Sequence, residues 1–333
     1  MVRWGIIGCG DVTEVKSGPA LQKASGSTLV AVMRRDFEKA TEYARRHGVP
    51  HVHADADALI DDPEVDAVYI ATPPVMHCDL ALAVAASRKP CLVEKPMAVS
   101  HAECERMIGA FRQAGVPLWV AYYRRALSRF LLVRDLLNGG AIGQVTSVHV
   151  EVYQQLADGD AARGWRFDPA VAGAGLFFDL ASHCFDLLDF LIAPVVEVAG
   201  VALNTGRSYE AEDVTTSSFQ LGDRVAGTGI WNFNAHINRD RLTIAGTHGE
   251  LLTPIFADED VTVKTLPGDA VHSVRNPPHV HQPLVQTIVD ELRGIGRCPS
   301  DAESGARTSW VLERCVAAYY RRRDGAHIRS TFS

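Results

Sequence analysis

The sequence predicts a chain of two parts: an α/β part with a doubly wound parallel sheet (residues 1–122), then an α+β part with an open, predominantly antiparallel sheet flanked by helices (residues 123–333). Two patterns predict this division. Up to about residue 122, short Val- and Ile-rich runs alternate with helical stretches. Beyond it, strand-like runs follow one another closely with glycine turns between them, which is typical of antiparallel sheets. The length of 333 residues, about twice a typical domain, also favours two domains.

In the first part, strands and helices are expected to alternate, which implies right-handed crossovers and therefore a parallel sheet. The expected strands are 2–8, 29–33, 65–71, 91–93 and 118–121, and the expected helices are 36–47, 79–87 and 102–114.

In the second part, the hydrophobic periodicity predicts a sheet with helices before it and after it. The expected strands are 145–154, 195–203, 214–221, 224–233, 241–245 and 261–266, and the expected helices are 129–137, 176–192, 283–293 and 303–322. One face of an open sheet needs cover, which either the chain's own helices or a second subunit provides.

The composition favours a cytoplasmic, globular enzyme. The formal net charge of −7 argues against a general affinity for nucleic acid or for anionic membranes. The seven cysteines are scattered without a C-x-x-C pair, which is typical of free thiols in a reducing compartment. The first residues show no leader pattern, and no apolar run reaches about 18 residues without charge, so no membrane span is expected.

The expected first strand runs into Gly8-Cys9-Gly10-Asp11-Val12-Thr13. A glycine pair between a strand and a helix permits a tight turn and lets the backbone approach a pyrophosphate near the helix N–H groups. Thr13 stands where the usual fingerprint has a third glycine. We interpret the segment as the dinucleotide-binding turn of a Rossmann domain, with Gly8, Gly10, Asp11 and Val12 as cofactor contacts. The alternative is an ordinary tight turn.

The end of the expected second strand bears on the choice of cofactor. An NAD site usually has an acidic residue there that binds the ribose hydroxyls. Here the strand ends in Arg34 and Arg35, and the first acid is Asp36. Because guanidinium groups pair well with phosphate, the sequence favours NADP over NAD, with both arginines as contacts of the 2′-phosphate. The two arginines are alternatively a solvated helix start.

Two further segments follow the ends of parallel strands, where open α/β sheets bind ligands. One is Thr72-Pro73-Pro74-Val75-Met76-His77, in which Thr72, Pro73 and His77 are predicted cofactor contacts. For His77, a helix-capping or merely exposed role is an alternative.

The other segment is Glu94-Lys95-Pro96, which follows the expected strand 91–93. It delivers Lys95 to the ligand crevice, where an amine can donate a hydrogen bond to a reacting oxygen. Glu94 is a predicted cofactor contact beside it. A cis bond at Pro96 is one way to fix the direction of the lysine. The alternative is a surface ion pair between Glu94 and Lys95.

Asp179 and His183 are four residues apart on an otherwise apolar expected helix, so their side chains share one face. A buried helix does not carry such a polar stripe without partners. Histidine is the natural proton acceptor near neutral pH, and a carboxylate beside it would orient it. Asp186 is interpreted as structural. No third residue at a convincing spacing completes a metal site with Asp179 and His183, so no metal is expected.

Taken together, these motifs resemble the glucose-fructose oxidoreductase and inositol dehydrogenase family. The likeness covers essentially the whole chain and includes Gly8-x-Gly10, Thr72-Pro73-Pro74-x-x-His77, Glu94-Lys95-Pro96, Trp165-Arg166-Phe167-Asp168-Pro169 and the run from Ala172 to His183, with Ala174 where the family often has glycine. The resemblance implies an NAD(P)-dependent oxidoreductase whose second domain often forms a dimer interface through its sheet. It also implies a catalytic set of Lys95, Asp179 and His183. Tyr123, Trp165 and Arg166, together with His183, are the predicted substrate contacts.

The resulting hypothesis is hydride transfer between NADP(H) or NAD(H) and a carbinol or carbonyl carbon of a sugar, cyclitol or diol. The expected assembly is a homodimer or homotetramer formed through the C-terminal sheet. A dihydrodiol dehydrogenase or an aldose or imine reductase is an enzymatic alternative. A non-catalytic, nucleotide-binding sensor or regulatory protein of the same fold is the alternative from another class, because a fold alone does not fix a function.

Overall fold

The computed structural model describes residues 1–156 and 164–323, and its chain divides into two compact units. The first unit comprises Met1–Ala98, Ala102–Leu127 and Pro277–Ala306. The second comprises Val99–His101, Ser128–Asn276 and the chain from Arg307 on. This division differs from a single boundary at residue 122, because a segment from the far end of the chain packs with the first unit.

The first unit is built on a six-stranded parallel sheet with the strand order β3-β2-β1-β4-β5-β6. This order is that of doubly wound dinucleotide-binding folds, and it confirms the predicted parallel sheet. Its strands are β1 (Val2–Ile7), β2 (Ser27–Met33), β3 (His51–His53), β4 (Ala67–Ile70), β5 (Cys91–Val93) and β6 (Leu118–Val120).

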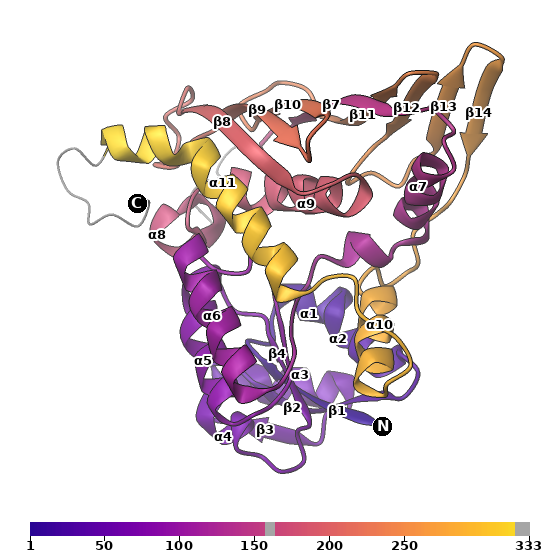
Figure 1. Cartoon of the computed structure of the whole chain (residues 1–333). Helices are drawn as coiled ribbons and strands as arrows, with labels where there is room; N and C mark the ends of the chain where they lie inside the picture. The colour runs from indigo at the N-terminus through magenta and orange to yellow at the C-terminus, as the bar shows by residue number, and fades with distance from the viewer. Residues whose placement is uncertain (157–163, 324–333) are drawn as a thin grey trace. The chain divides into compact units, whose positions relative to one another are not determined.

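Helices cover both faces of this sheet (Figure 1). Alternate residues of β1 enter two separate cores: Trp4 and Ile6 pack on one face and Ile7 on the other. The first face is covered by α2 (Ser17–Lys23), α3 (Phe37–His47) and α10 (Gln282–Leu292), and the second by α4 (Ala56–Ile60), α5 (His77–Ala86) and α6 (His101–Ala114). The strand interiors are apolar throughout, as expected for a parallel sheet buried on both sides.

Helix α10 explains why the first unit is discontinuous in sequence. Leu284, Val285, Ile288 and Val289 recur at helical spacing and are buried, each about 1% exposed or less. They join the same core as Trp4 and Ile6. Burying four aliphatic side chains stabilises this docking by roughly 1.5–3 kcal/mol per residue before entropy is subtracted.

The second unit contains an eight-stranded sheet with the order β14-β13-β12-β11-β7-β10-β9-β8. All neighbouring pairs are antiparallel except β10 with β7, which confirms the predicted, predominantly antiparallel sheet. Its strands are β7 (Val145–Tyr153), β8 (Val195–Leu203), β9 (Val214–Leu221), β10 (Val225–Asn232), β11 (Arg239–Gly246), β12 (Gly249–Thr253), β13 (Val261–Thr265) and β14 (Gly268–His272).

Helix α9 (Leu176–Leu191) lies along one face of this sheet (Figure 1). Its Phe177 and Phe185 pack on Trp231 of β10 with ring centroids 5.1 and 5.3 Å apart. The other helices assigned to this unit are α7 (Ser128–Asn138), the one-turn α8 (Pro169–Ala172) and most of α11 (Ala302–Arg323), which belongs to this unit from Arg307 on. Strands β9 and β10 alternate between buried and exposed residues, so the chain's own helices cover one face.

One stretch, Pro169–Leu191, is long and apolar enough by composition to cross a membrane, with a mean hydropathy of 1.3. Within the fold, 78% of the apolar 18-residue window of that stretch is buried, as in the core helix of a globular protein. It includes α9, whose aromatic side chains form the contacts with β10.

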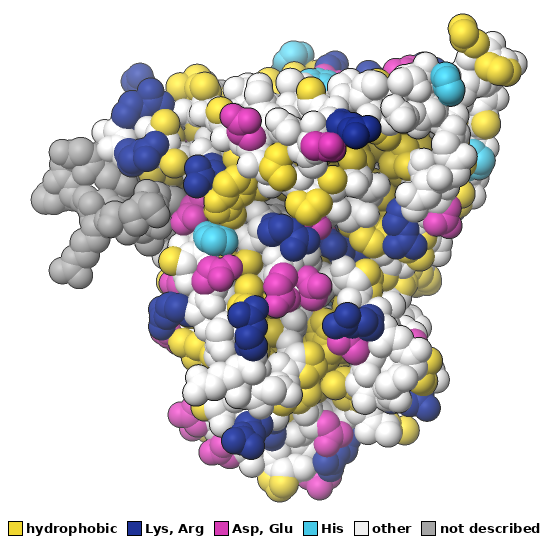
Figure 2. Space-filling model, in the orientation of Figure 1, with side chains coloured by type: hydrophobic (Ala, Val, Ile, Leu, Met, Phe, Trp, Pro, Cys, Tyr) yellow, Lys and Arg dark blue, Asp and Glu magenta, His cyan; other side chains and the backbone are white. Residues whose placement is uncertain are grey.

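The surface seen in Figure 2 mixes acidic and basic side chains rather than segregating them. Apolar atoms gather at the tip of the β13–β14 hairpin, where Leu266 is fully exposed. Further along β14, Val271 is 62% exposed.

Candidate active site

The turn after β1 requires glycine at its first position. Gly8 has a φ of +92°, a left-handed conformation that residues with a side chain rarely adopt. A Cβ atom there would lie 2.8 Å from Thr72 Cγ2 and 3.0 Å from the Thr72 backbone nitrogen. The turns after β1 and β4 therefore touch, so the predicted contacts Gly8 and Thr72 lie together.

Gly10 is different, because its φ of −157° is extended and a Cβ there would approach only the Gly8 carbonyl oxygen, at 3.8 Å. It is the N-cap of α1 (Asp11–Val15). The Thr13 hydroxyl donates to the Gly10 carbonyl oxygen at 2.8 Å and accepts from the Gly10 N–H at 2.9 Å. Thr13 thus closes the first turn of α1 at the position of the missing third glycine. Asp11 and Val12 begin this helix.

The two glycines should respond differently to alanine. Gly8→Ala is expected to destabilise the fold by roughly 1–3 kcal/mol, because it adds both backbone strain and a collision. Gly10→Ala, which meets open space, should leave the melting temperature unchanged and weaken nucleotide binding. Calorimetry and fluorescence titration with reduced cofactor separate the two effects. Equal melting temperatures for both variants would contradict the assignment of Gly8.

Arg34 lies beside the glycine turn, where its Nη1 donates to the Cys9 carbonyl oxygen at 3.3 Å. Arg35 is exposed. Asp36 is the N-cap of α3: its carboxylate accepts the Lys39 N–H at 3.1 Å and pairs with the Lys39 ammonium at 3.1 Å. The first acid after β2 is therefore used as a helix cap, and a cation is the charged group beside the turn.

His77 is fully buried, which excludes the exposed role that the sequence left open. Its Nε2 lies 2.8 Å from the Thr72 carbonyl oxygen, and its Nδ1 lies 3.1 Å from that of Pro96. Burial lowers the pKa of His77, and the carbonyl contacts oppose the shift in part. The ring thus links the backbones of the segments after β4 and β5.

Thr72 itself keeps hydrogen-bonding capacity. Among the residues that the structure describes, its buried Oγ1 has no hydrogen-bond partner. A buried hydroxyl without a partner is costly and marks a place where a ligand group can bind. Pro73, which follows it, is the N-cap of the short 3₁₀ helix η1 (Pro74–Met76).

The segment after β5 places the Glu94 side chain inside the unit. Glu94 is 8% exposed, and its carboxylate accepts from the Tyr69 hydroxyl at 2.5 Å and from the Lys95 N–H at 3.1 Å. Burial, and then the charge of Glu94, raises the pKa of Tyr69. Lys95 is half-buried, and the bond between Lys95 and Pro96 is cis.

Sequence reasoning missed His281, which lies next to Glu94 in the same unit. Its Nδ1 is 3.9 Å from Glu94 Oε1, and its ring stacks on that of Tyr123 with centroids 4.5 Å apart. Burial lowers the pKa of His281 to about 3, with Lys16 and Lys95 adding to the shift, so the ring is neutral at physiological pH. The half-buried Tyr123 begins the 3₁₀ helix η2 (Tyr123–Ala126).

In the second unit, α9 carries the predicted catalytic residues Asp179 and His183. His183 is 5% exposed, and Asp186, one turn further on, is 1% exposed. The Asp179 carboxylate is partly exposed and pairs with Arg166 Nε at 3.3 Å. The Arg166 guanidinium in turn stacks on the Trp165 ring at 4.6 Å. The structure therefore links Trp165, Arg166 and Asp179, which the sequence predicts separately.

The N-terminus of α9 is held by a buried carboxylate that sequence reasoning also missed. Glu212 has no exposed surface, and it accepts from the Gly175 N–H at 3.0 Å and from the Tyr320 hydroxyl at 2.5 Å. Burial raises the pKa of Glu212 to about 7. A Cβ at Gly175 would lie 2.8 Å from Ala211 Cβ, so this glycine allows the chain at residues 211–212 to approach.

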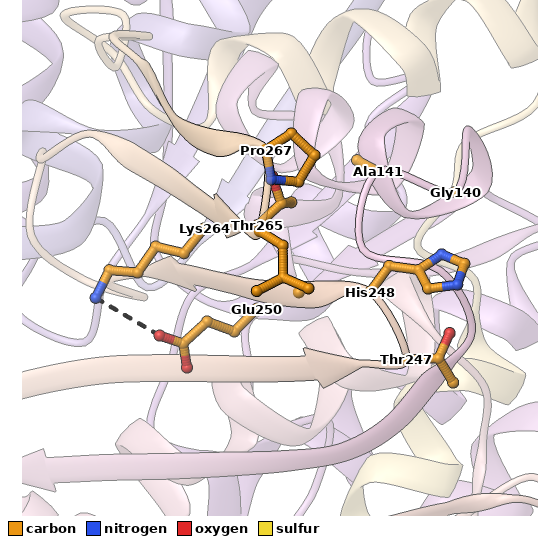
Figure 3. A pocket seen from close by; sticks show the side chains of 10 residues that line it. Gly140, Ala141, Thr247, His248, Glu250, Lys264, Thr265 and Pro267 are labelled. Carbon is orange, nitrogen blue, oxygen red and sulfur yellow. Dashed lines mark ion pairs between the residues drawn. The ribbon is translucent and has the colours of Figure 1, made fainter.

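A groove elsewhere in the second unit is unrelated to these residues (Figure 3). It has a volume of about 850 Å³ and lies beside β12 and β13, and none of the predicted site residues lines it. Its charged side chains, Lys264 and Glu250, pair with each other at 3.5 Å.

The predicted residues thus form two groups, each within its own unit. The first holds the predicted cofactor contacts with Lys95 and Tyr123, and the second holds Trp165, Arg166, Asp179 and His183. Among residues 1–156 and 164–323, no cluster of three or more His, Cys, Asp or Glu side chains is arranged to hold a metal ion.

Comparison with known proteins identifies relatives over the whole length. An oxidoreductase, P35, from Formosa agariphila is 34% identical over 94% of this chain and 97% of its own. The 1,5-anhydro-D-fructose reductase of Ensifer adhaerens is 25% identical over 95% of each chain. A levoglucosan dehydrogenase, solved in complex with NADH and levoglucosan, matches the fold with a TM-score of 0.84 at 22% identity, over 96% of this chain and 97% of its own.

Family descriptions match both parts of the chain. Residues 2–122 match the GFO/IDH/MocA oxidoreductase family with its NAD-binding Rossmann fold, and residues 130–252 match the C-terminal domain of the same family. The chain therefore belongs to the GFO/IDH/MocA family of NAD-binding oxidoreductases.

Proposed function

We propose that the chain catalyses reversible hydride transfer between a nicotinamide cofactor and a carbinol or carbonyl carbon of a small polyhydroxylated compound, such as a sugar, cyclitol or diol. The observation that carries the proposal is the polar stripe of α9, where Asp179 and His183 stand one turn apart on a helix that is otherwise largely apolar. The names of the relatives, which refer to 1,5-anhydro-D-fructose and levoglucosan, support the substrate class.

Each member of the proposed catalytic set has a separate task. His183 takes the hydroxyl proton on oxidation and returns it on reduction, as histidine can near neutral pH. Lys95 donates a hydrogen bond to the reacting oxygen and stabilises the negative charge that develops there. Asp179, paired with Arg166, positions the hydroxylated substrate. The nicotinamide supplies or accepts the hydride.

The cofactor contacts are proposed to be Gly8, Gly10, Asp11, Val12, Arg34, Arg35, Thr72, Pro73, Glu94 and Lys95. The residues present fit a dinucleotide for two reasons. The turn at Gly8 lets another backbone approach closely, and the buried Thr72 hydroxyl has no hydrogen-bond partner within the described part of the chain. His77 belongs to this set only through the backbone of Thr72. Tyr123, Trp165 and Arg166 are proposed substrate contacts.

NADP is the proposed cofactor in preference to NAD, and Arg34 provides the test. Arg34→Ala should raise KM for NADP by roughly tenfold relative to KM for NAD, since a guanidinium–phosphate pair contributes on the order of 1–3 kcal/mol. The exposed Arg45 on α3 is the matched control, and Arg45→Ala should leave the ratio unchanged. An equal change in both KM values after Arg34→Ala would favour NAD.

The function itself is tested by following the absorbance of the reduced cofactor. Purified protein is mixed with NADP or NAD and a panel of sugars, cyclitols and diols, and with reduced cofactor and the corresponding carbonyl compounds. Turnover that Lys95→Ala abolishes supports the proposal. Nucleotide binding without turnover on the panel would instead support the non-catalytic sensor.

The protein is further proposed to be a cytoplasmic homodimer or homotetramer assembled through the face of the eight-stranded sheet that α9 does not cover. Val201 and Leu203 of β8 are about half exposed, at 56% and 48%. Light scattering after size-exclusion chromatography checks this assembly, and a monomer at micromolar concentration would contradict it.

A further inference from the structure

Phe256 lies beside the proposed catalytic base. Its ring meets the His183 ring edge to face, with centroids 6.1 Å apart and planes at 77°. His183 is buried, whereas Phe256 is only half-buried, so the phenyl ring still has accessible surface. An aromatic face next to a proton acceptor is a surface against which a substrate can pack.

The loop that carries Phe256 is held by a single carboxylate. Asp240, at the start of β11, accepts three consecutive backbone N–H groups, those of Ile255, Phe256 and Ala257, at 2.8, 2.6 and 2.7 Å. Hydrogen bonds to an ionised carboxylate are about twice as strong as neutral ones. Three of them on adjacent residues fix the backbone of Phe256.

A buried guanidinium holds the same loop from its carbonyl side. Arg129 is 1% exposed, and its Nη1 donates to the carbonyl oxygens of Ala257, at 2.5 Å, and Glu259, at 3.1 Å. The Asp240 carboxylate binds the N–H groups of this loop, and the Arg129 guanidinium binds its carbonyl oxygens. Together they restrict the movement of its backbone. The phenyl ring is thereby presented to His183 in one position.

We propose that Phe256 determines substrate shape, forming an apolar wall beside His183 against which the C–H face of a cyclic polyhydroxylated substrate packs, with Asp240 as its positioning residue. This inference rests on the proposed function and narrows its substrate class to rings. The C–H bonds on one face of a saturated sugar or cyclitol ring form an apolar patch, which matches an aromatic ring. An open-chain polyol exposes no comparable flat face.

The test compares cyclic with open-chain substrates. For Phe256→Ala, the ratio of kcat/KM for levoglucosan, D-glucose or myo-inositol to kcat/KM for sorbitol should fall roughly tenfold, the loss of a contact worth on the order of 1 kcal/mol or more. Phe256→Tyr should retain the ratio. The half-buried Tyr153, whose ring stacks on Arg239 at 5.1 Å, is the matched control, and Tyr153→Ala should leave the ratio unchanged.

The positioning role of Asp240 needs a second comparison. Asp240→Asn should lower the same ratio, by less than Phe256→Ala, because one amide oxygen replaces two acceptors. The double variant Phe256→Ala with Asp240→Asn should have the same ratio of cyclic to open-chain kcat/KM as Phe256→Ala alone, as expected when one residue acts through the other. Additive losses would overturn the claim that Asp240 acts through Phe256.

A binding measurement separates this inference from the proposed function. In saturation-transfer NMR with levoglucosan, irradiation of the aromatic protons should reach the ring C–H protons in the wild type, and more weakly in Phe256→Ala. A wild type that shows saturation transfer to levoglucosan yet turns over no substrate would refute the proposed function and support the proposed substrate contact at Phe256. If the wild type turns over substrate but Phe256→Ala leaves the ratio of cyclic to open-chain kcat/KM unchanged, the proposed role of Phe256 is refuted. An unchanged saturation-transfer signal in Phe256→Ala would refute it as well.

Discussion

Replacing His183 by asparagine is expected to lower kcat by roughly 10²- to 10⁴-fold, the usual contribution of a positioned acid or base. Asparagine keeps the polarity of the side chain and much of its size, but it cannot take a proton at neutral pH. Nucleotide affinity should stay unchanged, because the proposed cofactor contacts lie in the other unit. Initial rates as a function of pH and a fluorescence titration with reduced cofactor measure both quantities.

The pH profile distinguishes a base from a structural histidine. If His183 exchanges the substrate proton, the acidic limb of the kcat profile should disappear in His183→Asn, whereas a packing defect would scale the whole curve down. His149 is the matched control, since it lies exposed on β7 with its Nδ1 2.7 Å from the Thr228 hydroxyl oxygen. His149→Asn should be fully active. Retention of more than about a tenth of kcat in His183→Asn would exclude it as the base.

Much of the fold could be predicted because its elements have strong periodicity and clear ends. The expected strands at 91–93, 195–203 and 214–221 match the structure residue for residue. The missed helices and strands have three to seven residues each; they are β3, α2, α4, α8, β12 and β14. Such short segments carry too few residues to show a period, and pairing with longer neighbours decides their conformation.

The packing of α10 shows a second limit of prediction from sequence. Its helical character is visible in the sequence, but the surface on which it packs is not. An apolar stripe indicates that a helix is buried on one face, but it does not identify the element that covers that face. The stripe joins the core of the parallel sheet and brings His281 next to Glu94, 187 residues earlier in the chain. The segment before α10 is rich in proline and contains His279 as well as His281, and nothing in its sequence indicates which histidine contacts Glu94.

Some of the site residues could be predicted from the sequence and others could not. Asp179 and His183 could be predicted because they interrupt an apolar helix, and Lys95 because it follows a buried strand. Glu212 and Asp240 could not be found, since their importance depends on backbone N–H groups that tertiary structure brings to them. His77 was noticed for its motif, but only the structure shows that its ring nitrogens contact backbone carbonyls.

Glu212→Gln is expected to stabilise the protein at about pH 8 by about 3 kcal/mol and to change little at about pH 4. Burial raises the pKa of Glu212 from 4.5 to about 7, with the neighbouring charge of Asp213 adding to the shift. The folded state therefore binds the proton more tightly than the unfolded state does. A glutamine is neutral at every pH, so it avoids the ionisation that burial opposes.

The sign follows from the two pKa values. Well below pH 4.5 the Glu212 carboxyl is neutral in both the folded and the unfolded state. The stabilisation that comes from its raised folded pKa is then fully present. As the pH rises, only the unfolded state ionises at first, so stability falls until the folded state also loses its proton near pH 7. The stability difference between Glu212→Gln and the wild type should grow across this window and stay constant above it. Urea unfolding of both proteins at several pH values measures the difference, in which all other titrating groups cancel.

Two companion variants show what the carboxylate does. Tyr320→Phe removes the hydroxyl that donates to Glu212, so it should raise the folded pKa of Glu212 further and extend the upper end of the window to higher pH. Glu212→Ala leaves a cavity and an unpaired Gly175 N–H at the start of α9, so it should destabilise at every pH. A difference between Glu212→Gln and the wild type that is independent of pH would show that the pKa of Glu212 is the same in the folded and unfolded states, and it would contradict this prediction.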